Sequence, residues 1–381
     1  MPSFTKSAQK ARPPLYRCKP FCYCGRRLGA GRSRKTISIR AVAAAARVSV
    51  TTVSHVVSGK RPVNPETAKR VRRTMRRLGY VPNHVARSLV LGRTQTIGLL
   101  VPDIANPYFA NLARGVEDGA EALGFSVVLC NTDFNANREA RYMDVLRARG
   151  LDGIIYAAGA PPSFRRLAEV AKSFPLVVVD EQILGIQAPS IVSNNRAGGY
   201  LVGKHLAALG HRKALYVGGP PILQTAKERL AGFEEAFLEA SGASIHKVYA
   251  DYRREGGYLA VKDFLRATTD FSAIFAGNDL MAIGAIQALR EAGKTVPNDI
   301  SVVGFDDTPL AELHNPPLST VRQPVYELGR HAAETMIRTL EPTRHPVPST
   351  LVLDVSFIDR GSTAAVARRT RPTRPAARVD R

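Results

Sequence analysis

The sequence has 381 residues, of which 45 % are hydrophobic and 23 % are charged, and its net charge at pH 7 is +22. This length allows two or three domains, and the composition is that of a globular protein. The sequence has no run of about 18 apolar residues, which argues against a helix that crosses a membrane. We therefore expect no membrane-spanning segment.

The positive charge lies at the two ends of the sequence. Residues 1–95 hold 22 Lys and Arg and one acid, Glu66, whereas residues 96–360 hold 26 basic and 30 acidic residues. Residues 361–381 add six Arg against one Asp. A basic N-terminal module on a near-neutral body indicates a polyanionic partner, either nucleic acid or a phosphate-bearing membrane surface.

The terminal segments 1–35 and 361–381 have no hydrophobic periodicity, and we predict that both are basic and disordered. Three of the four cysteines lie in the first segment, and no His precedes His55 to complete a zinc site there. So few cysteines argue against a disulfide framework and favour the reducing cytoplasm. We expect no metal and no cofactor.

Residues 36–80 predict a small all-helical domain. The expected helices are Ile39–Ala46, Val50–Ser58 and Pro65–Leu78. Ser49 and Asn64 are suitable caps for the second and third helices, and Gly79 is a natural end for the third. Two short helices joined by a tight turn and braced by a third form a helix-turn-helix arrangement.

Residues 96–360 predict strands that alternate with helices, the pattern of a doubly wound α/β sheet. The apolar runs expected as buried parallel strands are Ile97–Val101, Phe125–Cys130, Gly153–Tyr156, Leu176–Val179, Ala214–Gly218, Ala273–Ala276 and Ser301–Phe305. Helices expected between them include Asn111–Leu123, Asn137–Arg149, Ala197–Leu209, Glu228–Ala240 and Leu280–Ala292. Because one sheet needs fewer residues, we expect two lobes, with a ligand bound beyond the carboxyl ends of the strands.

The helix expected at Val50–Ser58 is suited to reading DNA bases. Three valines face its core side, which leaves short polar side chains at its start pointing outward. The residues that we expect in the major groove are Ser49, Val50, Thr51, Thr52 and His55. Basic residues between Arg40 and Arg77 would contact phosphates and position the domain. A plain three-helix bundle with a solvated basic face is the alternative.

Four segments together resemble the lactose repressor/galactose repressor (LacI/GalR) family. They are Ile39–Ala43, Val48–Ser58, Tyr80–Leu89 and Ile97–Pro102. The resemblance covers residues 37–360. It implies a helix-turn-helix head, a hinge helix and linker over residues 81–95, and a two-lobed periplasmic-binding-protein-like sensor over residues 96–360. It also implies a homodimer that binds a palindromic double-stranded DNA operator.

The resemblance implies that Asn83–Leu89 is the hinge, with Asn83, Ala86 and Leu89 at the DNA. Leu89 would wedge into the minor groove and kink the duplex. The alternative is an ordinary linker helix in which Leu89 packs on its own protein. The chain departs from many relatives at Ala41 and Arg47, and a left-handed backbone at Arg47 would cost about 1–2 kcal/mol.

The resemblance also implies an effector site, whose expected residues are Tyr108, Phe109, Ser193, Thr225, Arg229, Tyr252, Asn278, Asp279 and Asp306. Aromatic faces stack on sugar or purine rings, and a guanidinium offers donors to neighbouring hydroxyls. The alternatives are two core aromatics at a helix start and a structural ion pair for Arg229. Leu223 stands where the purine repressor has a ligand-contacting Arg, which favours a neutral sugar or polyol.

Three other classes fit less well. A free sugar-binding protein for transport needs a signal peptide and no DNA-binding head, and a nicotinamide-dependent oxidoreductase needs a glycine-rich turn that does not follow Ile97–Val101. An architectural DNA-binding protein needs no α/β body. We predict a non-enzymatic, cytoplasmic transcription repressor that a small-molecule effector controls, as inducer or as corepressor. Its polyanionic partner is then DNA, and we expect no membrane partner.

Overall fold

The computed structural model describes residues 37–59, 61–80, 92–158, 164–341 and 349–366. The chain divides into two compact units, residues 1–82 and 83–381. We call the described part of the first unit the head and that of the second unit the body, and we treat each separately. The extension 1–35 and the hinge residues Asn83, Ala86 and Leu89 lie outside the described residues.

The head has three helices, and all three have the predicted bounds: α1 (Ile39–Ala46), α2 (Val50–Ser58) and α3 (Pro65–Leu78). The Ser49 hydroxyl accepts a hydrogen bond from the Thr52 N–H, and the Asn64 side chain accepts one from the Glu66 N–H. The helices bury a small core of Val42, Ala43, Ala46, Val53 and Val71. The two caps therefore fix where α2 and α3 begin, and the core holds the helices together.

Arg47 ends α1 with a left-handed backbone, the conformation whose cost was considered in the sequence analysis. Its φ is 51° and its ψ is 52°. Its N–H bonds to the Ala43 and Ala44 carbonyls, which closes the helix. A non-glycine residue in this conformation costs about 1–2 kcal/mol. The turn into α2 thus keeps its geometry at a small cost in stability.

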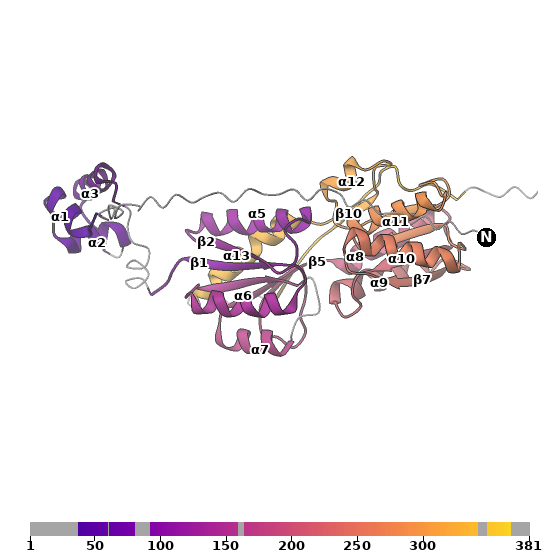
Figure 1. The fold of residues 1–381 in the computed structure, drawn as a ribbon, viewed down its shortest axis with the longest axis horizontal. Coiled ribbons are helices and arrows are strands. Elements are labelled where there is room, and N and C mark those ends of the chain that lie inside the picture. The colour runs from indigo at the N-terminus through magenta and orange to yellow at the C-terminus, as the bar shows by residue number, and fades with distance from the viewer. Residues whose placement is uncertain (1–36, 60, 81–91, 159–163, 342–348, 367–381) are drawn as a thin grey trace, which may run out of the picture. The chain divides into compact units, whose positions relative to one another are not determined.

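The first lobe of the body contains a six-stranded parallel sheet with the order β11-β5-β4-β3-β1-β2. Its strands are β1 (Thr96–Val101), β2 (Ser126–Asn131), β3 (Gly153–Ala157), β4 (Leu176–Val179), β5 (Ser190–Ser193) and β11 (Thr350–Leu353). Helices α5 (Pro107–Ala122) and α13 (Val325–Leu340) cover one face, and α6 (Ala136–Ala148) and α7 (Phe164–Ser173) cover the other (Figure 1).

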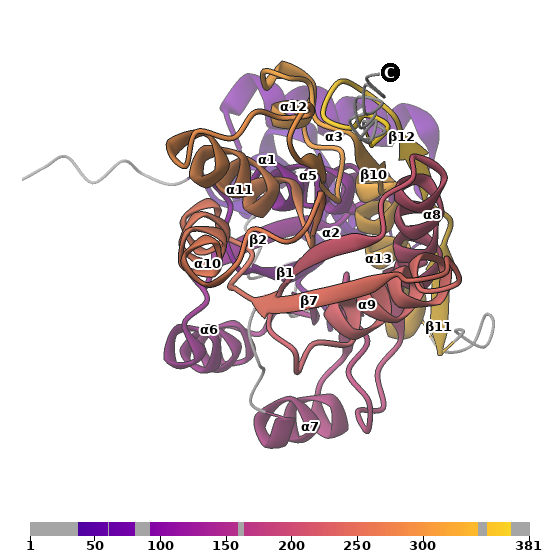
Figure 2. The ribbon, with the colours of Figure 1, turned by 90° about the vertical axis from the view of Figure 1, so that its right-hand side faces the viewer.

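The second lobe contains a four-stranded parallel sheet with the order β7-β6-β8-β9. Its strands are β6 (Lys213–Gly218), β7 (Ser244–Tyr249), β8 (Ala273–Ala276) and β9 (Ser301–Val303). Helices α8 (Asn195–Ala208) and α9 (Gln224–Phe237) pack on one face, and α10 (Arg254–Ala267) and α11 (Asp279–Glu291) pack on the other (Figure 2). The short helix α12 (Pro309–Leu313) follows β9.

The chain passes between the two lobes three times. It leaves the first lobe after β5 to form α8, and it returns after β10 (Thr320–Arg322) to form α13. It then crosses again from β11 to β12 (Ser356–Ile358), which pairs antiparallel with β10. Both lobes are therefore assembled from separate parts of the sequence.

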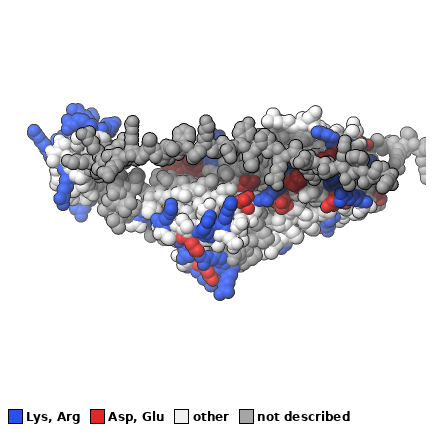
Figure 3. Space-filling model, viewed as in Figure 1, with Lys and Arg blue, Asp and Glu red and all other residues white. Residues whose placement is uncertain are grey.

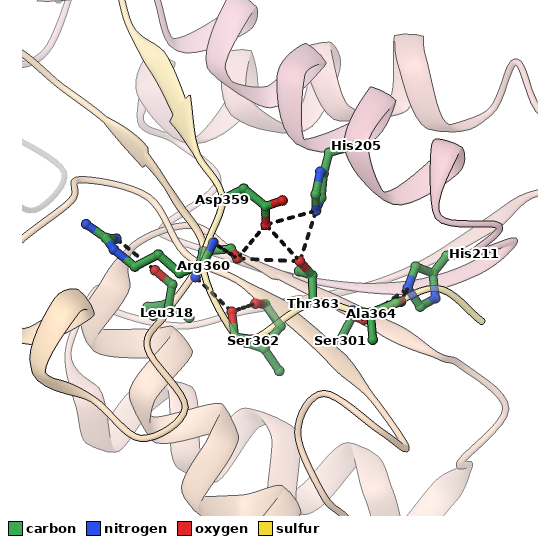
Figure 4. Close-up of polar contacts among 11 residues, drawn as sticks. His205, His211, Ser301, Leu318, Asp359, Arg360, Ser362, Thr363 and Ala364 are labelled. Atoms are coloured by element: carbon green, nitrogen blue, oxygen red, sulfur yellow. Dashed lines mark hydrogen bonds and ion pairs between the residues drawn. The ribbon is translucent and has the colours of Figure 1, made fainter. Parts of the chain in front are cut away.

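Two predictions about the body need correction. The run Phe125–Cys130 was expected as a buried strand, but β2 is an edge strand in which only Cys130 is buried. The disordered tail was expected from residue 361, yet Ser362 is fully buried and donates a hydrogen bond to the Val302 carbonyl. The Ala364 carbonyl contacts the His211 ring at 3.1 Å (Figure 4). Residues 361–366 therefore belong to the second lobe.

No single helix among the described residues is long and apolar enough to cross a membrane. Helices α1 and α2 meet the length and composition test only as a pair, bent by 107°. Both helices turn apolar side chains to the core of the head.

Candidate functional site

The start of α2 presents the side chains that the sequence assigned to DNA reading. Val50 is 41 % exposed, Thr51 is exposed, and His55 is partly exposed. The hydroxyls of Ser49 and Thr52 lie 2.8 Å apart and bond to each other. Because these two hydroxyls also form the cap, the expected base contacts fall mainly on Val50, Thr51 and His55.

The head is strongly basic around this helix. Among its described residues only Glu66 is acidic, whereas nine are Lys or Arg: Arg40, Arg47, Arg61, Lys69, Arg70, Arg72, Arg73, Arg76 and Arg77. Blue side chains gather over α1–α3 in Figure 3. One of them, Arg70, also braces the fold, because its Nε donates to the Ala46 carbonyl at 3.0 Å. Such a charge density on a small helical unit suits a polyanion.

The body has a cavity between its two lobes, beyond the carboxyl ends of their strands. The first lobe lines it with Asn106, Tyr108, Phe109, Phe134, Ala158 and Asp180, and the second with Leu223, Thr225, Arg229, Tyr252, Asn278 and Asp306. The cavity volume is about 40 Å³. Seven of the nine predicted effector residues therefore lie together at the place that parallel sheets favour for ligands.

Arg229 lies at the centre of the polar side of this cavity. It is 4 % exposed, its Nε donates to Asn195 Oδ1 at 2.8 Å, and its Nη1 donates to the Gly277 carbonyl at 2.5 Å. Its guanidinium carbon stands 3.9 Å from the centre of the Phe305 ring. No carboxylate of the described residues is within ion-pair distance of Arg229. Neutral groups and an aromatic face thus hold it, rather than the structural ion pair considered as the alternative.

Two buried carboxyl groups face the same space. Tyr108 Oη donates a hydrogen bond to Asp180, and Gln323 Nε2 donates to Asp306 Oδ1 at 2.8 Å. Burial raises the pKa of both carboxyls, although the nearby Arg229 opposes the shift in each. Both groups therefore have spare acceptor positions for donors on a ligand.

Tyr252 adds a polar group without a partner of its own. Its hydroxyl lies near the Thr225 side chain but makes no hydrogen bond of ordinary geometry with a described residue. Burial raises its pKa to about 12, so the hydroxyl is neutral at pH 7. A buried hydroxyl without a partner is costly, and a ligand hydroxyl would satisfy it.

Ser193 and Asp279 do not line the cavity, contrary to expectation. Asp279 is fully buried and accepts hydrogen bonds from the Thr308 N–H at 2.7 Å and from the Thr320 hydroxyl at 2.6 Å. It ties the start of α11 to the chain after β9. Ser193 ends β5 and borders a separate pocket that also includes Lys227.

Comparison with known proteins identifies the family. Residues 38–83 match the model of the bacterial regulatory proteins of the lacI family, and residues 204–363 match that of a periplasmic binding protein-like domain. The ribose operon repressor of Halalkalibacterium halodurans is 36 % identical over 321 residues, which cover 83 % of this chain and 96 % of that protein. The chain is a member of the LacI family.

Two solved structures of LacI-family proteins extend the comparison. The lac repressor dimer bound to operator and the anti-inducer ONPF is 28 % identical, with a TM-score of 0.76, and the match covers 87 % of this chain and all of that one. A LacI-family regulator from Enterococcus faecalis V583 with bound ribose is 34 % identical, with a TM-score of 0.64, over 71 % of this chain and all of that one. The predicted fold and family are thereby confirmed. This LacI-family chain is a DNA-binding transcriptional regulator.

Sequence reasoning missed several cavity residues of this LacI-family protein. Asp180 and Phe134 are left-handed, with φ 72° and 54°, and both follow strands of the first lobe. Asn106 caps α5 by accepting a hydrogen bond from the Tyr108 N–H. The position of Asp180 directly after the apolar run Leu176–Val179 was the signal available, because strand ends supply ligand contacts in such sheets.

Within the described residues, no group of three or more His, Cys, Asp or Glu side chains is arranged to hold a metal ion. The buried histidine His211 contacts Ser272 and Ser301 at 2.8 and 3.0 Å, and burial lowers its pKa to about 4. It lies under the last described segment of the second lobe (Figure 4). This histidine therefore has a structural role.

Proposed function

We propose that this LacI-family repressor responds to a neutral sugar or related polyol that binds in the cavity between the lobes. The observation that carries the proposal is the combination of Arg229 with the carboxyls of Asp180 and Asp306 around one space. A sugar hydroxyl both donates and accepts hydrogen bonds. The guanidinium supplies donors and the carboxyls supply acceptors, so the set matches vicinal hydroxyls.

The charge of the cavity favours an uncharged ligand. Two acidic side chains and one cation line it, and no other Lys or Arg among the described residues does so. An anionic ligand such as a sugar phosphate would be repelled by whichever carboxyls are ionised, and one guanidinium offers little compensation. Tyr108 and Phe109, whose ring centres are 5.1 Å apart, provide apolar surface for the C–H faces of a sugar ring.

The apolar Leu223 and the names of relatives support the same class of effector. Leu223 is buried and lines the cavity. It stands at the position where the purine repressor has a ligand-contacting Arg. The relative from H. halodurans is named as a ribose operon repressor, and the E. faecalis regulator was solved with ribose. A pentose is therefore the first candidate.

A monosaccharide would shift the lobes or the side chains between them as it enters this cavity of about 40 Å³. We infer that this movement is passed to the head through the hinge residues Asn83, Ala86 and Leu89. In the proposed mechanism, two heads of a dimer place α2 in successive major grooves.

We also propose that the protein acts in the cytoplasm and catalyses no reaction. The relatives named above are repressors and regulators rather than enzymes. Incubation of the protein with pentoses and their phosphates should yield no product above a blank without protein. Steady turnover of any of them would contradict this part.

A thermal-shift screen followed by an operator-binding assay tests the effector. D-ribose, D-xylulose, cellobiose, ribose 5-phosphate, guanine and hypoxanthine are each added, since a ligand of the folded state raises Tm. We expect a neutral sugar to raise Tm and to change the affinity for a genomic operator fragment. Arg229→Ala should remove the response to sugar while operator binding stays intact. A response confined to purines or phosphates, or an Arg229→Ala variant that responds normally, would refute the proposal.

A further inference from the structure

Helix α9, which carries Thr225 and Arg229 to the cavity, lacks a cap from its own sequence. Its N-cap position is Leu223, whose side chain has no polar atom. The first N–H groups of a helix need acceptors, and the positive end of the helix favours a carboxylate there. The group that meets this need belongs to the other lobe.

That group is the carboxyl of Glu181, which follows β4 in the first lobe and is 2 % exposed. Its Oε1 accepts from the Gln224 N–H at 2.9 Å, and its Oε2 accepts from the Thr225 hydroxyl at 2.9 Å. The Thr225 N–H lies 3.3 Å from Oε1. One buried side chain thus takes at least three hydrogen bonds from the start of a helix in the opposite lobe.

The position of Glu181 links this contact to the ligand space. Its neighbour Asp180 lines the cavity, whereas Glu181 itself does not. Arg229 follows Thr225 by about one helical turn, so both project from the same side of α9. A further contact between the lobes, in which Arg253 lies 3.3 Å from Asp133, is exposed to solvent and therefore weak.

We propose that Glu181 is a positioning residue for the effector: by capping α9 across the two lobes, it holds them together and keeps Thr225 and Arg229 in place. The inference rests on the proposed function, because it assigns the effector to the cavity beside α9. Without Glu181, the first turn of α9 has no acceptor, and the second lobe loses its buried polar contact with the first at this point.

The titration of Glu181 provides a second readout, because a change in its charge acts on the contact between the lobes. Burial raises its pKa from 4.5 to about 7, with a further increase from Asp180 and opposing hydrogen bonds from Thr225 and Gln182. The other ionisable groups around it are Tyr156 on β3, Tyr252 before α10, and Lys227 on α9. Both tyrosines stay neutral near pH 7, since burial raises the pKa of each.

Separation of the lobes would hydrate Glu181 and return its pKa toward 4.5. The joined arrangement then binds the proton more tightly, so it is favoured at low pH and disfavoured as pH rises through about 7. These two pKa values imply that the ratio of joined to separated lobes falls about 10-fold between pH 6 and pH 8, and affinity for D-ribose falls to the extent that the free lobes are separated. Glu181→Gln keeps one acceptor oxygen for the start of α9 and has no carboxyl to titrate, so its affinity should not change between pH 6 and pH 8.

The test compares Glu181→Ala and Glu181→Gln with the control Glu139→Ala in the full chain. Glu139 is also a buried acid of the first lobe, but its bond at 2.9 Å goes to Tyr156 of the same lobe. Amide hydrogen exchange without ligand should show faster exchange at Gln224 and Thr225 in Glu181→Ala alone. D-ribose affinity should fall about 10-fold or more in that variant and much less in the control.

Unchanged exchange at Gln224 and Thr225 in Glu181→Ala, or equal losses in Glu139→Ala, would overturn the positioning role. A wild-type pH profile that survives in Glu181→Gln would overturn it too. If the wild type binds none of the sugars, the proposed effector fails, and the exchange measurement, which needs no ligand, still decides the role of Glu181.

Discussion

At the scale of single residues, the head separates side chains that can read bases from those that can only hold phosphates. Val50, Thr51 and His55 lie at the start or on the accessible side of α2. The arginines of α3 are long, charged and mostly exposed. Base edges discriminate between sequences, whereas phosphates are the same in every duplex.

Replacement of Thr51 or His55 by Ala should therefore relax the choice of operator. We expect a loss of about 1–3 kcal/mol in binding to the operator, and little loss on random duplex of the same length. Fluorescence anisotropy with both duplexes measures the difference. As a control, Arg72→Ala should weaken binding to both duplexes alike. An equal loss on both duplexes for Thr51→Ala and His55→Ala would show that α2 does not read bases.

At the scale of elements, helix pairs approach each other through glycines. A Cβ placed on Gly199 of α8 would lie 2.1 Å from the Arg229 carbonyl oxygen, and one on Gly232 of α9 would lie 1.9 Å from that of Arg196. Neither distance is tolerable for a side chain. These two glycines therefore set the spacing of α8 and α9, and through it the position of Arg229.

Gly232→Ala should force α8 and α9 apart. We expect a loss of stability of about 1–3 kcal/mol, the usual range for overpacking, and a weaker response to sugar because Arg229 moves with its helix. Urea unfolding of the body and the thermal-shift response measure the two effects. Lys227→Ala, on the exposed side of the same helix, is the control and should change stability by no more than about 0.5 kcal/mol. Wild-type stability in Gly232→Ala would contradict the packing argument.

The elements that were predicted correctly are those with local signals. Ser49, Asn64, Pro65 and Gly79 mark the ends of α2 and α3 within a few residues of sequence, and the central strands are continuous apolar runs. The strands β10, β11 and β12 are three or four residues long and pair with partners far away in sequence, so no local pattern reveals them.

The candidate site was predictable where chemistry follows from residue type at a strand end. Asn278 and Asp306 were found in this way, and the resemblance supplied Tyr108 and Arg229. The prediction was wrong for Asp279, because its carboxylate oxygens accept hydrogen bonds from Thr308 and Thr320. The sequence analysis also missed Glu181, because its partner α9 begins 43 residues later and in the other lobe. Such a pairing depends on how the lobes meet.

At the scale of the whole molecule, DNA and the proposed sugar differ in charge, so salt should affect the affinity of the protein for each of them differently. The basic head releases counterions from DNA when it binds, whereas the proposed sugar is neutral. With 6–10 phosphate contacts for the complex, operator affinity should fall by about 10³–10⁵ between 50 and 200 mM salt. Sugar affinity over the same range should change less than about twofold.

Titrations of operator and of D-ribose at four salt concentrations test this contrast. A shallow salt dependence for the operator would show that the arginines of α3 do not face phosphates. A steep one for the effector would show that the cavity prefers a charged molecule, contrary to the proposed sugar.

The three crossings of the chain between the lobes have a consequence for synthesis. The core of the first lobe includes Leu328 and Met336 of α13, and its sheet is completed only by β11. The second lobe is completed by β12 and by residues 361–366. On the ribosome, the first lobe lacks a strand of its sheet until residue 353 has emerged, and the second lobe lacks its last segment until residue 366 has emerged. We therefore expect a nascent body to stay dependent on chaperones until release, and a premature stop codon within α13 to yield no folded lobe at all.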